Sequence, residues 1–315
     1  MNLTRRGLVA LSLATPALAQ PARPIALVVA YPAGGDTDAL ARLYAEKLSQ
    51  RLGRQVVVEN RSGASGAVGS IHVSRATPDG ETLLMAPSTF PIVPHVLRRG
   101  ANYDPVRDFT PVIMTGTGPM ILMASRQSGI RTLADVQAQG RAGLIVGYGS
   151  PGSGSPMHLL GEMFNQAAGL RLAEVAYRGV APVVNDLLAG VIAIGYATPG
   201  AVTEHIAAGT LVPIATSERT RSPILPNVPT FADAGFDVDV TVWWGIFGPR
   251  GMPAAIAETW AGHFNAVLQM PDVIQRMLAF GAVVGGGDGA RLTQFVQADY
   301  DRFGALVRQL GLQQE

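Results

Sequence analysis

Two short loops rich in small residues contain the groups best able to bind a ligand. The first is YPAGGDT at residues 31–37, and the second is SPGSGS at residues 150–155. Each loop follows a short apolar run and precedes a stretch with apolar residues at helical spacing. Each loop is therefore predicted to join a buried strand to the N-terminus of a helix.

Loops of this kind can bind an anion without a charged side chain. The first backbone N–H groups of a helix have no partner within it, and the helix dipole adds positive potential at the same end. A carboxylate can accept hydrogen bonds from those groups, and glycine lets the backbone approach a ligand closely. The alternative is an ordinary tight turn in which Asp36 or Thr37 caps the helix. One loop leaves both interpretations open, whereas two facing loops would form a ligand cleft.

The rest of the chain must supply the elements that position these loops. Short apolar runs alternate with helical patterns, which is typical of βαβ units and of a mostly parallel sheet. In the run at 110–125, two strands are predicted with a polar break at Thr115-Gly116-Thr117-Gly118. The chain of 315 residues is long enough for about two domains. We therefore expect two similar α/β lobes.

The composition excludes several other classes of protein. The chain has no cysteine, which excludes disulfides, thiolate metal sites and cysteine nucleophiles. Its five histidines are widely separated without a His-Glu-x-x-His motif, so we predict no metal site. There is no Gly-x-Ser-x-Gly, the loop PAGGDTDA lacks the Gly-x-Gly-x-x-Gly order and a P-loop lysine, and the formal charge of +1 gives no footprint for nucleic acid. We expect no catalytic residues and no cofactor, with a hydrolase built from dispersed residues as a remote alternative.

The N-terminus has the pattern of an export signal. Arg5 and Arg6 precede an apolar stretch, and Ala17-Leu18-Ala19 fits a cleavage site. We therefore predict a signal peptide at residues 1–19, of the Sec type or, from Thr4-Arg5-Arg6, of the twin-arginine type. A buried amphipathic helix is the alternative interpretation. The signal predicts export to the periplasm.

Motifs along nearly the whole mature chain carry a more specific signal. They are, in order, YPAGGDTDALARLYAEKLSQRLG, QVVVENRSGASGAVGS, ATPDGETLLMAPS, YDPVRDFTPV, GSGSPMHL, VAYRGVAPVVNDLLAG, RSPILPNVPTFADAG and WWGIFGP. In their order and spacing, from about residue 24 to residue 311, the chain resembles the Bug (TctC-like) family of extracytoplasmic solute receptors of tripartite tricarboxylate transport systems.

The resemblance implies a type II periplasmic binding protein fold. In this fold two α/β lobes are joined by two crossing strands, which we expect near residues 114–118 and 239–243. One lobe would comprise residues 20–116 and 241–315, and the other residues 117–240. A small organic acid would bind in the cleft between them.

The resemblance also implies a site made mainly of backbone amides and ordered water, with few charged side chains. The ligand-binding residues expected from it are Tyr31, Pro32, Ala33, Gly34, Gly35, Thr37, Ser65, Gly66, Ser88, Ser150, Ser153, Gly154, Ser155, His158, Tyr177 and Ala197.

Some of these residues also have a purely structural interpretation. His158 could organise its loop through a backbone hydrogen bond, and Tyr177 could be a buried packing residue. Trp243 and Trp244 are expected to pack at the hinge and the cleft wall.

Three features depart from the pattern of the family, at four positions. Tyr31 stands where phenylalanine is usual, and Asp36 stands where a small or neutral residue is usual. Ala193 and Ala197 replace the usual aspartates of their segment. A carboxylate at Asp36 would repel an anionic ligand unless it caps the helix. The loss of an acceptor at Ala197 suggests a ligand that lacks an amino group or is more apolar.

The function implied by the resemblance is binding without chemistry. The open receptor would capture a small carboxylate, close over it and dock on the permease subunits of a membrane transporter. The alternative partner is a membrane sensor kinase that the same liganded receptor would serve. A monomer is the default for this type of receptor.

Overall fold

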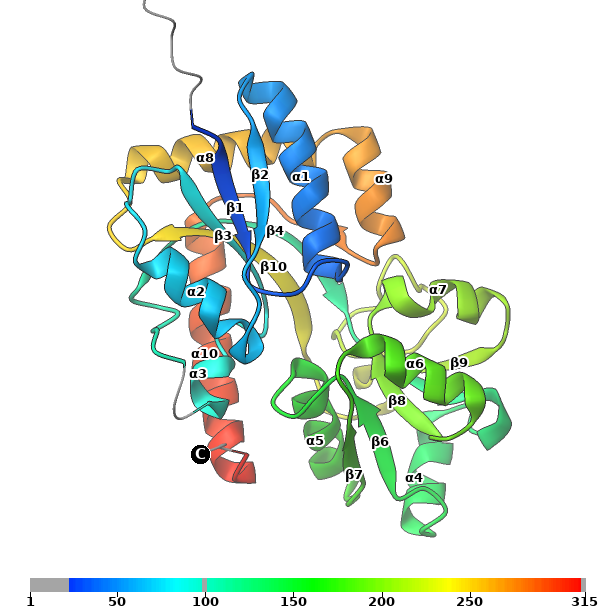
Figure 1. Ribbon diagram of the computed structural model, residues 1–315. Coiled ribbons are helices and arrows are strands. Elements are labelled where there is room, and N and C mark those ends of the chain that lie inside the picture. Colours follow the sequence, from blue (N-terminus) through cyan, green and yellow to red (C-terminus); the bar gives the residue numbers. More distant parts are fainter. Residues whose placement is uncertain (1–22, 98–100, 313–315) are drawn as a thin grey trace, which may run out of the picture.

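The computed structural model describes residues 23–97 and 101–312 and folds them into two α/β lobes (Figure 1). One sheet has six strands in the order β11-β4-β10-β3-β1-β2, and the other has five in the order β7-β6-β8-β5-β9. The predicted arrangement of two α/β lobes is confirmed. The predicted signal peptide lies outside the described residues. None of the described helices is long and apolar enough to cross a membrane.

The first lobe is assembled from two separate parts of the chain. Its early elements are β1 (Ile25–Val29), α1 (Asp36–Leu52), β2 (Val56–Asn60), α2 (Ala67–Ser74), β3 (Thr82–Pro87), α3 (Val93–Val96) and β4 (Phe109–Pro119). Its late elements are β10 (Thr241–Pro249), α8 (Ala254–Leu268), α9 (Pro271–Ala279), β11 (Val283–Val284) and α10 (Gly289–Leu310). Strand β1 pairs in parallel with β2 and β3, whereas β10 pairs antiparallel with β3 and β4.

The second lobe is formed by the intervening segment. Its elements are β5 (Ile121–Ser125), α4 (Leu133–Arg141), β6 (Gly147–Ser150), α5 (Pro156–Ala168), β7 (Ala173–Ala176), α6 (Val180–Ala189), β8 (Ile194–Ala197), α7 (Pro199–Ala207) and β9 (Leu211–Thr216). Strand β6 is parallel to β7 and β8, and β5 is antiparallel to β8 and β9.

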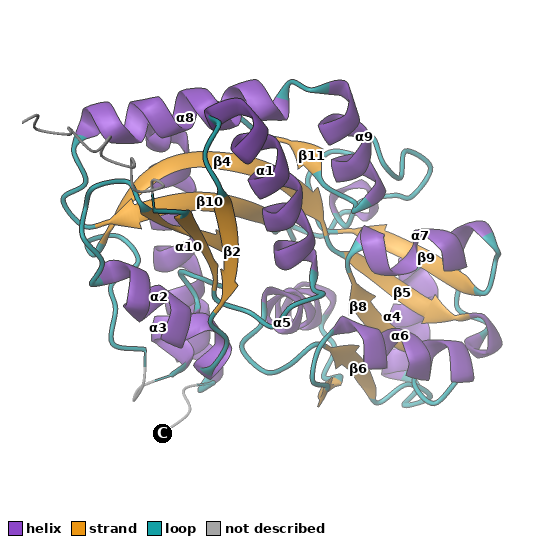
Figure 2. Cartoon of the chain, turned by 45° about the horizontal axis from the view of Figure 1, so that its top comes forward, coloured by secondary structure: helices purple, strands orange, loops and turns teal. Residues whose placement is uncertain are grey.

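The central strands of both sheets are buried on both faces, which explains why these strands are apolar runs. Successive side chains of a strand point to opposite faces. In β1, Leu27 belongs to the core with α1 and α8, while Val28 belongs to the core with α2 and α10. In β5, Leu122 and Met123 are divided between two cores in the same way. Helices therefore cover each sheet on both sides (Figures 1 and 2).

The sequence prediction of a break at residues 115–118 is wrong. Strand β4 runs without interruption to Pro119, and the chain changes sheets at Met120. Gly116 and Gly118 serve close packing instead. A Cβ at Gly118 would lie 2.7 Å from the carbonyl oxygen of Gly281, and one at Gly116 would lie 3.0 Å from that of Val283. The glycines therefore let the segment around β11 lie tightly against β4.

Ser217 ties together the two segments that cross between the lobes. Its backbone N–H donates to the carbonyl of Met120 at 2.9 Å, and the N–H of Met120 donates to Ser217 Oγ at 2.9 Å. The hydroxyl of Ser217 also donates to the carbonyl of Val240, just before β10. One fully buried serine thus fixes the outgoing and the returning strand at the hinge.

Carboxyl groups gather next to this hinge. Burial, aided by the nearby Asp239, raises the pKa of Glu218 from 4.5 to about 7. Burial also raises the pKa of Asp299 to about 6, although its hydrogen bond from Trp243 Nε1 at 2.7 Å opposes the shift. Asp239 itself pairs with Arg219 at 3.2 Å. Ionised Glu218 therefore destabilises the folded chain relative to protonated Glu218.

We predict that Glu218→Gln stabilises the protein at pH 8 more than at pH 5. The folded chain holds the Glu218 proton more tightly than the unfolded chain, so protonated Glu218 stabilises the wild type. The wild type loses this stabilisation as the pH rises from 4.5 towards 7, and the glutamine variant does not. Discounted for the partial exposure of Glu218 to water, the effect is about 1 kcal/mol, or roughly 2 °C in Tm at pH 8. Thermal unfolding followed by circular dichroism at both pH values checks it. Glu204→Gln, on the exposed face of α7, is the control, and an equal Tm change at both pH values would contradict the prediction.

Candidate functional site

A cavity of about 500 Å³ lies between the lobes. Its walls are the loops that follow β1, β2 and β3 in the first lobe and β6, β7 and β8 in the second. The predicted site residues that line it are Tyr31, Pro32, Ala33, Gly35, Thr37, Ser65, Ser88, Ser153, Gly154 and Ser155. Those that do not line it are Gly34, Gly66, Ser150, His158, Tyr177 and Ala197. The two small-residue loops therefore do face each other.

Four helices point their N-termini at this cavity. Their N-cap residues, Gly35 of α1, Ser155 of α5, Gly179 of α6 and Thr198 of α7, all line it. Only Ser155 accepts a capping bond, from the N–H of His158 at 3.2 Å. The unpaired N–H groups and the aligned dipoles of these helices give the cavity positive potential without a metal ion or a cluster of lysines.

Asp38 shapes the loop of the first lobe. Its carboxylate accepts from the N–H of Gly34 at 2.9 Å, from Arg42 Nε at 3.0 Å and from Asn60 Nδ2 at 2.9 Å. Burial alone would raise the pKa of Asp38, but the hydrogen bonds from Arg42, Gly34 and Asn60 outweigh it and hold that pKa below its ordinary value. The N–H of Gly34 is therefore occupied within the protein, while those of Gly35 and Thr37 have no partner among the described residues.

Tyr31 links three segments of the first-lobe wall. Its hydroxyl donates to the carbonyl of Ser65 at 3.1 Å and shares a short hydrogen bond with Thr89 Oγ1. Burial raises the pKa of Tyr31 to about 12, so the phenol stays protonated. Gly66 fits against this ring, because a Cβ there would lie 2.9 Å from the Tyr31 hydroxyl oxygen. The extra hydroxyl relative to phenylalanine thus braces the wall of the cavity.

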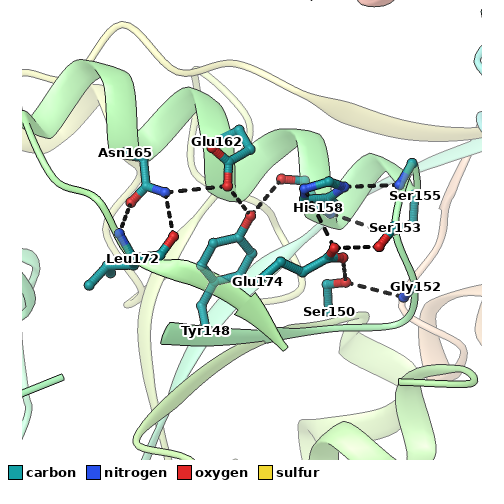
Figure 3. A network of polar contacts seen from close by, with 11 residues as sticks. Tyr148, Ser150, Gly152, Ser153, Ser155, His158, Glu162, Asn165, Leu172 and Glu174 are labelled. Carbon is teal, nitrogen blue, oxygen red and sulfur yellow. Dashed lines mark hydrogen bonds and ion pairs between the residues drawn. The ribbon is translucent and has the colours of Figure 1, made fainter. Parts of the chain in front are cut away.

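Glu174 of β7, whose side chain is 12% exposed, holds the cavity loop of the second lobe (Figure 3). Glu174 accepts from the hydroxyls of Ser150 and of Ser153, the latter at 2.5 Å. The hydroxyl of Ser150 in turn accepts from the N–H of Gly152 at 3.1 Å. Ser150 therefore supports the loop from behind, while Ser153 also lines the cavity.

His158 holds the same loop from the first turn of α5. Its Nδ1 accepts from the N–H of Gly154 at 2.9 Å, so Nδ1 carries no proton (Figure 3). Its Nε2 lies 3.6 Å from Glu174 Oε2, which is too long for a hydrogen bond. Burial lowers the pKa of His158 despite the nearby Glu174, and the ring stays neutral at pH 7. The geometry gives His158 the loop-organising contact that was one of its two interpretations.

Tyr177 and Ala197 both lie behind the cavity wall. The hydroxyl of Tyr177 donates to Asp186 at 2.7 Å, and burial together with that carboxylate raises the pKa of Tyr177 to about 12. Ala197 is fully buried in β8 and packs in the core with α6 and α7.

The structure also adds residues that the sequence analysis left out of the site. Asp36, Thr89, Arg178, Thr198 and Trp244 all line the cavity. Arg178 stands directly after Tyr177 in the motif VAYRG, and Thr198 precedes a proline as N-cap residues often do, so both had a local signal. Trp244 had been expected at the cleft wall as a packing residue. Within residues 23–97 and 101–312, no group of three His, Asp or Glu side chains could hold a metal ion.

Two lobes, a paired crossing and a cavity lined by helix N-termini define a two-lobe solute-binding protein. The model of the family described as tripartite tricarboxylate transporter family receptor, TctC, matches residues 40–312. The chain belongs to this family, as its motifs predicted.

The known relatives match this chain over nearly its full length. BugT of Bordetella pertussis is 34% identical over 324 residues, covering 99% of this chain and 99% of BugT. The periplasmic binding protein BugD is 29% identical with a TM-score of 0.81, covering 94% of this chain and 100% of BugD. Rpa4515 of R. palustris, whose structure was solved with adipate, is 31% identical with a TM-score of 0.83, covering 92% of this chain and 98% of that one. The predicted periplasmic binding protein fold is confirmed.

We predict that Glu174→Ala destabilises the second lobe by about 2 kcal/mol, because two serine hydroxyls lose a charged acceptor. Glu174→Gln should lose less, since its amide oxygen keeps one acceptor. Urea unfolding followed by far-UV circular dichroism measures both. A midpoint for Glu174→Ala equal to that of the wild type would show that Glu174 does not hold this loop.

Proposed function

We propose that this protein is a periplasmic receptor that captures a small organic acid in the interlobe cavity and delivers it to a membrane transporter of the tripartite tricarboxylate type. The observation that carries the proposal is the convergence of four helix N-termini on one cavity. A carboxylate is the ligand group that such an arrangement favours.

The charges around the cavity support an anionic ligand. The carboxylate of Asp38 is neutralised by Arg42 and by neutral donors, so it adds little repulsion, whereas Asp36 is a second carboxylate in the lining that opposes an anionic ligand. Arg178 is the one lysine or arginine among the described residues that line the cavity, and it comes from the second lobe. The hydroxyls of Thr37, Ser65 and Ser153 supply further polar groups. Rpa4515, a structural relative, was solved with the dicarboxylate adipate.

We propose closure of the two lobes as the mechanism. The first-lobe loop at 31–37 would capture the acid, and the second-lobe loop at 150–155 would then close over it. Gly154 meets the first lobe at Val96, where a Cβ on the glycine would lie 2.7 Å from Cγ2 of the valine. A Cβ on Gly200 would likewise lie 2.7 Å from the carbonyl oxygen of Phe280 in the first lobe. A ligand shifts the lobes toward this arrangement only by its extra affinity for the closed form.

The site supports binding without catalysis. No described histidine lines the cavity, and the hydroxyl of Ser153, which does line it, donates to Glu174 as one of the contacts that hold the loop. The same proposal includes export through residues 1–19, transfer of the ligand to the permease and a monomeric state. Service to a membrane sensor kinase is the alternative output of the same liganded receptor.

Isothermal titration of the mature chain with small mono- and dicarboxylates, each paired with its amide, tests the proposed ligand class. A carboxylate should bind and its amide should not, because the amide lacks the charge that the helix N-termini stabilise. Trp244 lines the cavity, so tryptophan fluorescence gives a second readout. Binding of the amide as tight as that of the acid would contradict the proposal.

We predict that Gly154→Ala weakens ligand binding about tenfold, because the added methyl group collides with Val96 when the lobes close. Gly154 also has a φ of +78°, so the substitution carries a backbone cost of about 1 kcal/mol. Gly143→Ala is the matched control, since Gly143 has a φ of +71° and open space around it. Titration calorimetry gives the affinities, and equal Kd values for the two variants would contradict a role of Gly154 in closure.

A further inference from the structure

Two polar side chains, one from each lobe, approach each other in the cavity, and their hydrogen bonds are not satisfied by the described residues. Asp36 is the first residue of α1 in the first lobe, and Thr198 is the N-cap residue of α7 in the second. Both line the cavity. The side chain of Thr198 is close enough to Asp36 to lower the pKa of that carboxyl, which burial raises more strongly.

The Thr198 hydroxyl is the unusual member of this pair. Thr198 is only 8% exposed, and its Oγ1 has no hydrogen-bond partner among the described residues. It does not cap its own helix either. A buried hydroxyl without a partner costs free energy, so a ligand that completes its hydrogen bonds gains affinity.

Asp36 differs sharply from the other aspartate of the same loop. Asp38 receives three hydrogen bonds from neighbouring groups. The described polar neighbour of the Asp36 carboxylate is the Thr198 hydroxyl, which lies close to it without the geometry of a full hydrogen bond, and no described cation pairs with Asp36. Next to a bound carboxylate, this second negative charge is repulsive unless the ligand itself brings a donor.

We infer that Asp36 and Thr198 together form a specificity subsite that selects small carboxylates bearing a hydroxyl or ammonium group over unsubstituted acids. A ligand O–H or N–H would donate to the Asp36 carboxylate, while the Thr198 hydroxyl completes the contact from the other lobe. A site built around a polar group rejects analogues that lack it, because its own polar groups then stay unpaired. The inference rests on the proposed function, since it concerns which acids that receptor prefers.

A direct Asp36–Thr198 hydrogen bond formed on closure is the competing interpretation. Such a latch would favour the closed form for every ligand alike, and its removal would weaken all acids by the same factor. A specificity subsite changes the ratio of affinities between two acids instead. The ratio therefore separates the two interpretations.

The experiment is isothermal titration with acids matched in chain length: succinate against malate and aspartate, and glutarate against 2-hydroxyglutarate and glutamate. The wild type should prefer a substituted acid by about tenfold or more within a series. Asp36→Ala and Thr198→Val should each bring this ratio close to one. Glu46→Ala, which removes a carboxylate from the exposed side of the same helix, should leave it unchanged.

Three outcomes would overturn the inference. Equal binding of substituted and unsubstituted acids by the wild type would remove the subsite while leaving the receptor function intact. An unchanged ratio in Asp36→Ala, with all affinities reduced alike, would establish the latch in its place. Absence of binding by every acid in both series would contradict the proposed function itself, and the inference with it.

Discussion

The architecture depends on one constraint, which is that the carboxyl ends of the parallel strands in both sheets meet at the gap between the lobes. The loops after β1, β2 and β3 and those after β6, β7 and β8 all contribute to a single cavity. Helices that begin after these loops must point their N-termini at it. The positive potential of the site therefore comes from topology rather than from charged side chains. The antiparallel strand β10 and the paired crossings at Ser217 keep the two sheet edges facing each other.

The two lobes stabilise their cavity loops by the same device. In the first lobe the N–H of Gly34 donates to Asp38, and in the second the N–H of Gly154 donates to His158, both four residues further along the chain. Each bond takes a glycine N–H away from the cavity and fixes the glycine in a left-handed conformation. The loops are thus organised from within, and the donors that remain are those of the helix N-termini. The second loop is also held by Glu174, which accepts from Ser150 and Ser153 although it lies 24 and 21 residues further along the chain.

Much of the fold could be predicted because its signals are local. The apolar runs marked the strands, and the small-residue loops marked where helices start. The error at residues 115–118 has a physical cause, since glycine and threonine in a strand look like a break unless the packing partner is known. Here Gly281 and the short strand β11 approach β4 so closely that only glycine fits. That contact joins residues far apart in sequence.

By itself the sequence determined the two-lobe α/β class, the family and the two loops that face the cavity, because strand periodicity, glycine placement and motif order are properties of neighbouring residues. Only the tertiary structure decided which groups of those loops face a ligand. It turned Gly34, Ser150 and His158 toward internal partners, and it placed Asp36 beside Thr198 across the gap. The partner of Ser150 and Ser153 is the distant Glu174, and the Asp38 that holds Gly34 is itself fixed by Asn60, so the spacing along one segment carries no record of either contact.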